Sequence, residues 1–305
     1  MKANSAGIIK TMRKEMGLSQ EEMAEQLFIS VRQLARIESG EVGMDVWQFI
    51  TTLELLGAPT EDFWLLYLDS GEYASYRDYR RLRRRLNYDN LSGAKAKDII
   101  AAMENSPLIK QPAVKQYVSH AKTYGDTTIP LTEKMDALLK AMYMSKPHFD
   151  EAKISEYRMT YNEISIALCM AECYEALEEY DKAIIMLQSM ISSRERAKVS
   201  EEDNELIFSS MYFVLARILS SAGRHKEAVR ACDRAIEICR EYNNHRNIPA
   251  MLYCMADCYY KLGEEEHIYK TLLIRGYYAA YAIGRNDIAK AIKADSLSNY
   301  GLVVP

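Results

Sequence analysis

Two neighbouring residues carry side chains that match the hydrogen-bonding edges of DNA base pairs. Arg32 has paired N–H donors, which suit O6 and N7 of guanine, and Gln33 has a donor beside an acceptor, which suits adenine. Val31 precedes them and offers an apolar contact for a thymine methyl group. All three follow Ser30, a residue type that often begins helices. The first turn of a helix at Ser30 therefore has the chemistry to read DNA sequence, the alternative being a solvated surface.

A second set of residues has the chemistry to hold a short peptide. An amide side chain pairs with both N–H and C=O of a peptide backbone, and aromatic rings bury its apolar side chains. Arg217 is suited to a carboxylate and Asp257 to an amine. For each residue, a packing or surface role is the alternative. The predicted peptide-binding residues are Asn162, Glu172, Asn204, Phe213, Arg217, Asn247, Tyr253, Asp257 and Tyr260.

Patterns typical of enzymes and metal sites do not occur in the sequence. It contains no P-loop, GxGxxG, HExxH or GxSxG motif, and its five histidines are scattered. Two cysteine pairs, 169/173 and 254/258, have the i, i+4 spacing of a helix and not the C-x-x-C spacing of zinc sites. We expect no enzyme activity, no cofactor and no metal, and reduced thiols in a cytoplasmic protein.

The DNA-reading turn is positioned by a series of short predicted helices. Gly17 ends the first, and the capping box of Ser19 and Glu22 begins the second. A very short connection leads to Ser30, which begins the third, and Gly40 ends it. Helices are predicted over about 5–16, 20–27, 30–39, 45–56 and 61–68.

The peptide-binding set falls on a repeated helical hairpin. Three stretches align on a small residue, Ala171, Ala216 and Ala256, with spacings of 45 and 40 residues. Gly223 and Gly263 supply tight turns seven residues after two of these alanines. Such hairpins stack into a superhelix with a concave groove. Further helices are predicted at about 95–104, 111–124 and 131–145, and a terminal capping helix at 285–299.

Composition supports an all-α protein without a membrane segment. The 305 residues include only 13 glycines and 7 prolines, and no apolar run is long enough to cross a bilayer. The N-terminus has no apolar stretch of the kind that signal peptides need. The net charge of −4 divides into −5 over 1–70, +5 over 71–97 and −4 over the remainder. DNA contact must therefore come from a local surface, and residues 2–36 carry six basic and four acidic residues.

The N-terminal segment resembles the XRE (lambda-repressor-like) helix-turn-helix family. Arg13, residues 17–24 and residues 30–40 carry the resemblance. The hairpins are similar to tetratricopeptide (TPR) repeats, although longer than the family's unit. Together the segments resemble the Rgg/PlcR/PrgX (RRNPP) class of peptide-responsive regulators. The implied fold is a five-helix domain followed by a TPR-like α-solenoid.

The resemblance implies a function for each segment. Residues 1–70 would bind DNA, 71–97 would form a basic linker helix, and 98–305 would sense a peptide and dimerise. Gln20 and Arg36 would contact phosphates, and an ion pair with Glu38 would orient Arg13 towards phosphate.

The resemblance also implies partners, and two alternatives stay open. The partners would be double-stranded DNA with a palindromic operator, a quorum-sensing peptide and a second copy of the chain. The alternative to the peptide is a protein partner. The run Arg80–Arg85 either touches phosphates or pairs with acidic surface on either domain.

Overall fold

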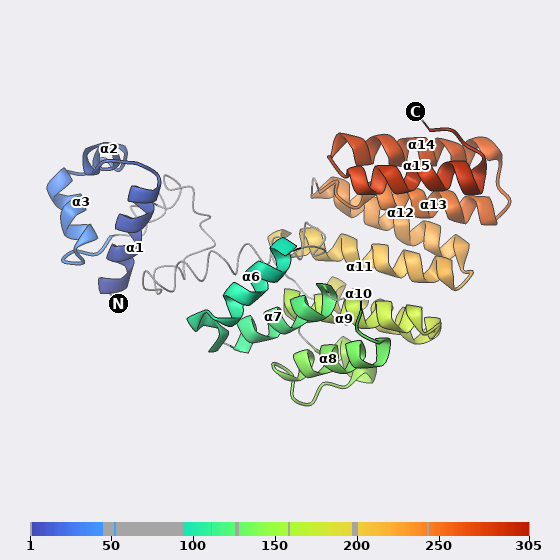
Figure 1. The fold of residues 1–305 in the computed structure, drawn as a ribbon, viewed down its shortest axis with the longest axis horizontal. Coiled ribbons are helices and arrows are strands. Elements are labelled where there is room, and N and C mark those ends of the chain that lie inside the picture. The colour runs from blue at the N-terminus through green and yellow to red at the C-terminus, as the bar shows by residue number, and fades with distance from the viewer. Residues whose placement is uncertain are drawn as a thin grey trace. The chain divides into compact units, whose positions relative to one another are not determined.

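The computed structural model describes residues 2–44, 52, 94–110, 112–125, 128–157, 159–196, 201–242 and 244–304. They belong to two compact units, Met1–Gly125 and Asp126–Pro305. The first contains α1–α3, α6 and α7, and the second contains α8–α15 (Figure 1). Every element in these ranges is a helix, as the sequence predicts.

Three short helices form the N-terminal part of the first unit, and their starts are capped as predicted. The Ser19 hydroxyl accepts a hydrogen bond from the Glu22 N–H at 3.0 Å, and the Glu22 carboxylate accepts one from the Ser19 N–H at 2.7 Å. The Ser30 hydroxyl accepts one from the Gln33 N–H at 3.1 Å. These bonds satisfy backbone donors that have no partner within the helix. The helices are α1 (Lys2–Glu15), α2 (Gln20–Gln26) and α3 (Val31–Glu38).

A small apolar core holds α3 in place. Both α1 and α2 pack against α3. Leu34 and Ile37 are three residues apart on one face of α3 and are 0% and 3% exposed. They contact a cluster that includes Ile9, Met12 and Met23 from the other two helices. The opposite face of α3 is therefore left to solvent.

The first unit ends in a helical pair that the periodicity also predicts. It consists of α6 (Ala94–Glu104), the short 3-10 helix η2 (Pro107–Lys110) and α7 (Pro112–Gly125). Met103 and Tyr117 are buried in it, and an exposed ion pair of 2.7 Å joins Lys122 to Glu104.

The second unit is a stack of helical hairpins. The first helices of the three hairpins are neighbours, because α11 packs against both α9 and α13. The expected terminal helix is present as α15, which packs on α14. In chain order the elements are α8 (Leu131–Tyr143), η3 (Glu151–Glu156), α9 (Tyr161–Ala176), α10 (Tyr180–Arg196), α11 (Glu201–Ser221), α12 (His225–Glu241), α13 (Ile248–Lys261), α14 (Glu266–Ala282) and α15 (Asn286–Tyr300).

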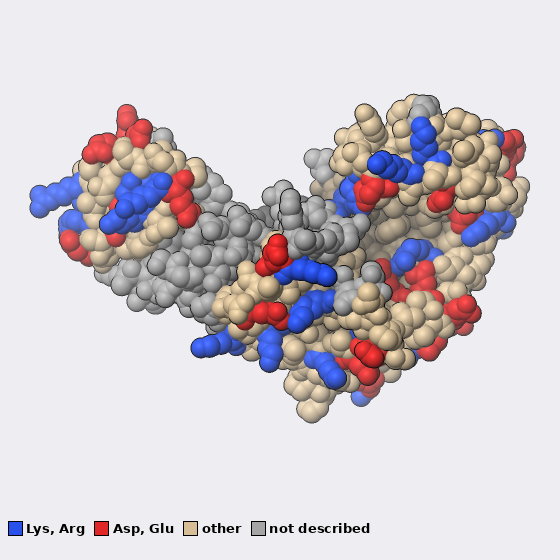
Figure 2. All heavy atoms as spheres, in the orientation of Figure 1, with Lys and Arg blue, Asp and Glu red and all other residues tan. Residues whose placement is uncertain are grey.

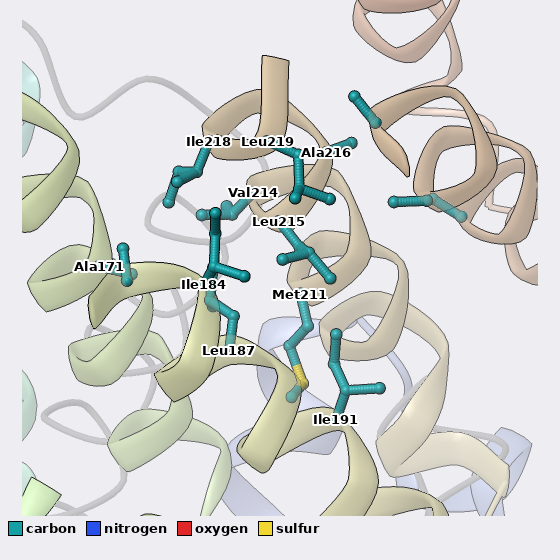
Figure 3. Packing of buried hydrophobic residues seen from close by; sticks show 14 of the residues in the cluster. Ala171, Ile184, Leu187, Ile191, Met211, Val214, Leu215, Ala216, Ile218 and Leu219 are labelled. Carbon is teal, nitrogen blue, oxygen red and sulfur yellow. The ribbon is translucent and has the colours of Figure 1, made fainter. Parts of the chain in front are cut away.

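The three aligned alanines are the points where the hairpin helices approach each other. Ala171, Ala216 and Ala256 are each 0% exposed. Figure 3 shows Ala171 and Ala216 among the larger apolar side chains of the same cluster, such as Ile184 and Leu215. A larger side chain at these positions would separate the helices, since protein interiors are close-packed.

The hairpin turns need a left-handed residue, and one hairpin lacks the expected glycine. Gly223 and Gly263 have φ values of +75° and +73°. The equivalent residue of the first hairpin is Glu178, which has φ +61°. An L side chain is strained in that region, because its Cβ approaches the backbone carbonyl. The α9–α10 turn therefore stores strain that the other two turns do not.

Several predictions lie outside the described residues. These are the helices at 45–56 and 61–68, apart from Thr52, and the linker over 71–93 with Arg80–Arg85. The predicted division of the chain at residues 70 and 97 therefore stays a prediction. In the ranges that are described, no helix combines the length and the apolar character that a membrane span needs.

Candidate nucleic-acid interface and ligand groove

The start of α3 projects from the first unit. Arg32 and Gln33 are exposed, and Val31 is 37% exposed. Ser30 is exposed too, and its hydroxyl oxygen caps the helix, which leaves its O–H free to donate. The four residues at the predicted reading turn therefore share one accessible helix end.

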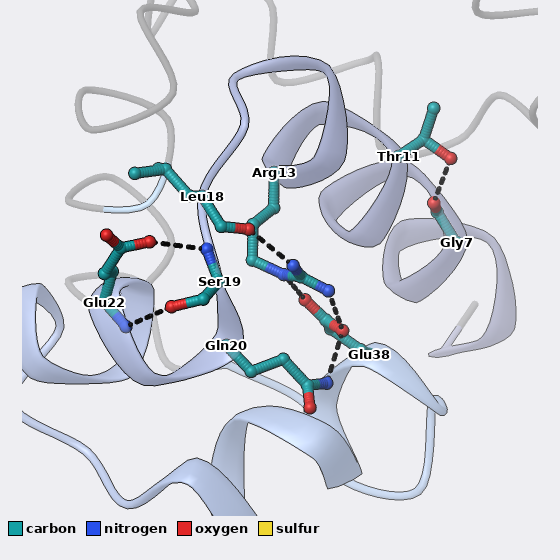
Figure 4. A network of polar contacts seen from close by, with 8 residues as sticks. All are labelled: Gly7, Thr11, Arg13, Leu18, Ser19, Gln20, Glu22 and Glu38. Carbon is teal, nitrogen blue, oxygen red and sulfur yellow. Dashed lines mark hydrogen bonds and ion pairs between the residues drawn. The ribbon is translucent and has the colours of Figure 1, made fainter.

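Arg13 is largely buried, in the ion pair with Glu38 that the resemblance implies. Its Nε and Nη2 donate to the Glu38 carboxylate at 2.6 and 3.1 Å, and its Nη1 donates to the Leu18 carbonyl at 2.7 Å (Figure 4). The side chains of Arg13 and Glu38 are only 8% and 2% exposed. The predicted ion pair is present, but it points inward and ties α1 to α3. A contact of Arg13 with a phosphate stays a prediction, and the role that the structure shows for this residue is to join the two helices.

Gln20 and Arg36 keep donors that a phosphate can use. One N–H of the Gln20 amide donates to Glu38 at 2.8 Å, so the same carboxylate that binds Arg13 orients Gln20. The second N–H of that amide remains available. Arg36 forms a 3.3 Å ion pair with Glu41, and both side chains are more than half exposed. Such a surface pair is worth at most about 1 kcal/mol, so a phosphate can replace Glu41.

Charge is unevenly distributed over the three helices. Glu21 and Glu25 are exposed on α2, whereas Arg32 and Arg36 are exposed on α3. Figure 2 shows acidic side chains gathered over α2 and basic side chains beside α3. The exposed charges of α3 therefore favour an approach to a duplex, whereas the exposed carboxylates of α2 do not.

Phe28, in the turn between α2 and α3, is a feature that the sequence did not predict. Its side chain is 95% exposed and its φ is +54°. The short connection between the helices requires a left-handed residue there, and glycine would adopt that conformation without strain.

Six residues form two rows on one side of α9, α11 and α13. Five of them belong to the predicted peptide-binding set, and the sixth is Leu168. The first row consists of the residues three positions before the aligned alanines, which are Leu168, Phe213 and Tyr253. The second row consists of the residues one position after them, which are Glu172, Arg217 and Asp257. All six are partly exposed. We call this side of the three helices the inner face. It carries an apolar row beside a charged row, and Figure 2 shows that the visible surface of the second unit is hollowed between its two ends.

Arg217 is already held by two carboxylates on the inner face. Its Nη2 donates to Glu172 at 2.8 Å, and its Nη1 forms an ion pair with Glu175 at 3.1 Å. The Ser221 hydroxyl donates to the other oxygen of Glu175 at 2.9 Å. The pair of Arg217 and Glu172 joins equivalent positions of successive hairpins. Both carboxylates would compete with a ligand carboxylate for Arg217, and its contact with a ligand stays a prediction.

Asp257 is occupied as well. One of its oxygens accepts a hydrogen bond from the Tyr300 hydroxyl at 2.9 Å, and the other lies 2.8 Å from the Lys261 ammonium. The sequence could not indicate the first contact, because Tyr300 comes from the end of α15. Asp257 thus has little capacity left for the amine that we expected it to bind.

Two of the remaining aromatic residues of the set, Tyr253 and Tyr260, belong to a tyrosine cluster. The Tyr253 hydroxyl donates to Asp295 at 3.1 Å, and burial together with this carboxylate raises the pKa of Tyr253 to about 12. The Tyr260 ring meets Tyr269 and Tyr300 edge-on, with centroids 5.3 and 5.0 Å away. Tyr260 is still 46% exposed, so it can contact a ligand, whereas Phe213 packs partly against the core.

The three asparagines of the set are not equivalent. Asn247 donates weakly to the Ser210 hydroxyl at 3.4 Å and stands at the start of α13. Asn162 is partly exposed near the start of α9. Asn204 falls in α11, and its side chain lies outside the described part of the structure.

The cysteines fill space between helices. All six are free thiols, and five of them are buried. Burial raises the pKa of the Cys169 thiol, which favours its neutral form. Among the described residues, no group of His, Cys, Asp and Glu could hold a metal ion.

Comparison with protein families and sequences identifies one segment. Residues 9–43 match the helix-turn-helix family HTH_3, and they include α2, α3 and the buried ion pair between Arg13 and Glu38. No curated protein sequence matches the chain.

Comparison with solved structures covers almost the whole chain. PlcR of Bacillus thuringiensis, in complex with the peptide PapR7 and DNA, has a TM-score of 0.66 and 18% identity over 95% of this chain and 98% of PlcR. ComR from S. thermophilus, in complex with DNA and its signalling peptide ComS, has a TM-score of 0.56 and 14% identity over 98% and 100%. The competence regulator ComR from Streptococcus vestibularis, with its signalling peptide XIP, gives 0.55 and 14% over 98% and 99%. The chain therefore joins a helix-turn-helix domain of the XRE type to a helical repeat domain, in the fold of PlcR and ComR.

Proposed function

We propose that the chain is a transcription regulator that binds DNA through α3 and a short signalling peptide on the inner face of its second unit. The observation that carries the proposal is the fold shared with PlcR over 95% of the chain, since that structure contains both a peptide and DNA. The proposal assigns the chain no catalytic activity and no cofactor.

DNA reading is assigned to the exposed start of α3. Ser30, Val31, Arg32 and Gln33 enter the major groove, where Arg32 binds guanine and Gln33 binds adenine. Gln20 and Arg36 contact phosphates on either side of the reading helix. With so few basic side chains, one copy binds weakly, so two copies bind a palindromic operator as a homodimer.

Peptide binding is assigned to the inner face. The apolar row of Leu168, Phe213 and Tyr253 accepts apolar side chains of an extended peptide, and Tyr260 adds an exposed ring. Asn162, Asn204 and Asn247 hold its backbone. Because the peptide touches several hairpins at once, its binding changes their relative rotation and hence the geometry of the dimer on DNA.

The proposal is tested with the full-length protein in two steps. Selection from random DNA duplexes identifies the operator, and an enriched palindrome is the expected result. Thermal-shift screening of peptide fractions from culture supernatant then identifies a stabilising peptide. Capture of a folded protein from a host extract, with no stabilisation by any peptide fraction, would replace the peptide by a protein partner. Absence of any enriched duplex would overturn the DNA assignment.

A further inference from the structure

One carboxylate oxygen on the inner face has no hydrogen-bond or ion-pair partner among the described residues, and it belongs to Glu172. Arg217 has a carboxylate on each side, and both oxygens of Asp257 are bound. Glu175 is also committed through both oxygens, to Arg217 and Ser221. Glu172 differs from these three, because its Oε1 accepts from Arg217 while no described residue contacts its Oε2.

The position of Glu172 makes this oxygen accessible to a ligand. The Glu172 side chain is 37% exposed and stands in the charged row, one helical turn from Leu168 in the apolar row. Glu175, by comparison, is only 14% exposed. A peptide that rests on the apolar row thus passes within reach of Glu172.

The surrounding charges favour a cation at this point. Arg217 faces two carboxylates, Glu172 and Glu175, so the three-residue cluster carries one negative charge in excess. The other titratable groups near Glu172 are Lys134 from α8, whose positive charge partly offsets this excess, and the Cys169 and Cys173 thiols of α9. Burial raises the pKa of Glu172, Arg217 and Lys134 lower it, and Glu175 raises it again, leaving it above its usual value. An added positive charge nearby would lower the free-energy cost of ionising Glu172.

We propose that Glu172 is the subsite for a cationic group of the peptide, either a lysine or arginine side chain or the free N-terminal ammonium. The cation takes the open Oε2 while Arg217 stays on Oε1, so no existing ion pair must break. This inference rests on the proposed peptide-binding function and names the charge that the peptide carries. It replaces the roles first expected for Arg217 and Asp257.

The proposal predicts a preference that can be measured with synthetic peptides. Peptides selected from a random library on the full-length protein are resynthesised with lysine or its neutral isostere norleucine, and with a free or acetylated N-terminus. We expect the cationic form to bind about tenfold more tightly than its neutral counterpart, the usual effect of one partly exposed charged hydrogen bond.

Two variants separate the subsite from a structural effect. In Glu172→Gln the preference should fall to less than about twofold, because the amide keeps the shape but not the charge. The matched control Glu264→Gln removes an exposed carboxylate from the turn after α13 and should keep the full preference. If the role of Glu172 were purely structural, Glu172→Gln would lower the melting temperature of the protein and leave its preference for the cationic peptide unchanged.

A pH series adds an independent readout. The bound cation lowers the pKa of Glu172, so affinity for the cationic peptide should be greatest above the raised pKa of the free protein and should fall as the pH is lowered through it. The neutral peptide should not show this dependence, and neither should Glu172→Gln with either peptide.

Each remaining outcome has a defined meaning. Equal binding of cationic and neutral peptides to the wild type, or a preference that persists in Glu172→Gln, would overturn the subsite and leave the proposed function intact. Failure of the wild type to bind any library peptide would overturn both.

Discussion

At the residue scale, Arg32 and Gln33 have side chains that are available to bind another molecule. Both are exposed, and neither side chain forms a hydrogen bond or an ion pair with another described residue. Their helix is fixed from behind by the buried Leu34 and Ile37. A rigid helix with free side chains at one end is what base recognition requires.

Replacing Arg32 by alanine should relax DNA specificity more than it weakens DNA binding in general. Loss of a bidentate contact to guanine costs about 1–3 kcal/mol at one operator position. Titration of the selected operator and of single-base variants, at constant salt, measures this directly. Arg230→Ala on α12 removes the same charge from an exposed site outside the helix-turn-helix and serves as the control. An equal loss for all duplexes would place Arg32 on a phosphate instead.

Breaking the ion pair of Arg13 with Glu38 should destabilise the first unit rather than alter its DNA preference. Glu38→Gln leaves the buried guanidinium without its counter-charge, at a cost of about 3 kcal/mol near neutral pH. Burial alone would raise the pKa of Glu38, but hydrogen bonds from Arg13 and Gln20 outweigh it and hold the pKa below its usual value.

This stability should depend on pH in one direction. A carboxyl group with a lowered pKa in the folded state contributes its full stability above its unfolded pKa and loses it as the pH falls through the folded value. The difference in unfolding free energy between wild type and Glu38→Gln should therefore shrink below about pH 4.5. Tryptophan fluorescence measures it, because Trp47 and Trp64 are the two tryptophans of the chain and both precede residue 71. A difference that stays constant with pH would contradict the assignment.

Individual contacts were predictable only where they are local or repeat in register. The caps at Ser19 and Ser30 follow from residue types three positions apart. The bond of Tyr300 to Asp257 joins residues 43 apart, and no local pattern announces it. The pair of Glu172 with Arg217 had a usable signal, because opposite charges occupy the same position of successive repeats.

At the element scale, the hairpin turns show how one residue determines the conformational strain in a turn between two helices. Gly223 and Gly263 adopt positive φ without strain, whereas Glu178 is strained in the same conformation because its Cβ approaches the backbone carbonyl. The helices themselves were predictable from periodicity and capping, and α6, α7, α8 and α15 lie within a few residues of the expected ranges. The positive φ of Phe28 and Glu178 was not predictable, since neither residue type favours a positive φ.

Replacing Glu178 by glycine should stabilise the second unit by about 1 kcal/mol, because the left-handed strain disappears. Urea unfolding of the full chain, followed by circular dichroism, measures the change. The reciprocal variant Gly223→Ala should be destabilising by about the same amount. No atom lies within 4 Å of the added Cβ at Gly223, so the cost there is conformational alone. Destabilisation by Glu178→Gly would show that the glutamate makes a compensating interaction.

At the scale of the whole molecule, a helix-turn-helix domain and a repeat domain are joined in one chain with the fold of PlcR. The sequence predicted this architecture, because the helix-turn-helix residues have fixed spacing and the repeats recur. It did not predict which charges remain open on the inner face, since that depends on contacts between elements distant in sequence.

Operator DNA and peptide should influence each other's binding by the same factor. If the peptide changes operator affinity, thermodynamic linkage requires that the operator change peptide affinity equally. Calorimetric titration of the peptide into the free protein and into its operator complex measures one side, and operator titration with and without peptide measures the other. Equal peptide affinity with and without operator would exclude the coupling.

The register of the two rows on the inner face also constrains how such a receptor can diverge. Each residue of a helix is rotated by about 100° from the one before it, so a single insertion before Arg217 in α11 would turn that guanidinium away from Glu172 and put a different residue at the α11 position of the row. Gain or loss of an entire hairpin, by contrast, would keep every later position in phase. New specificities should therefore arise by substitution within the rows or by exchange of complete repeats, while length changes accumulate only in the connections between hairpins.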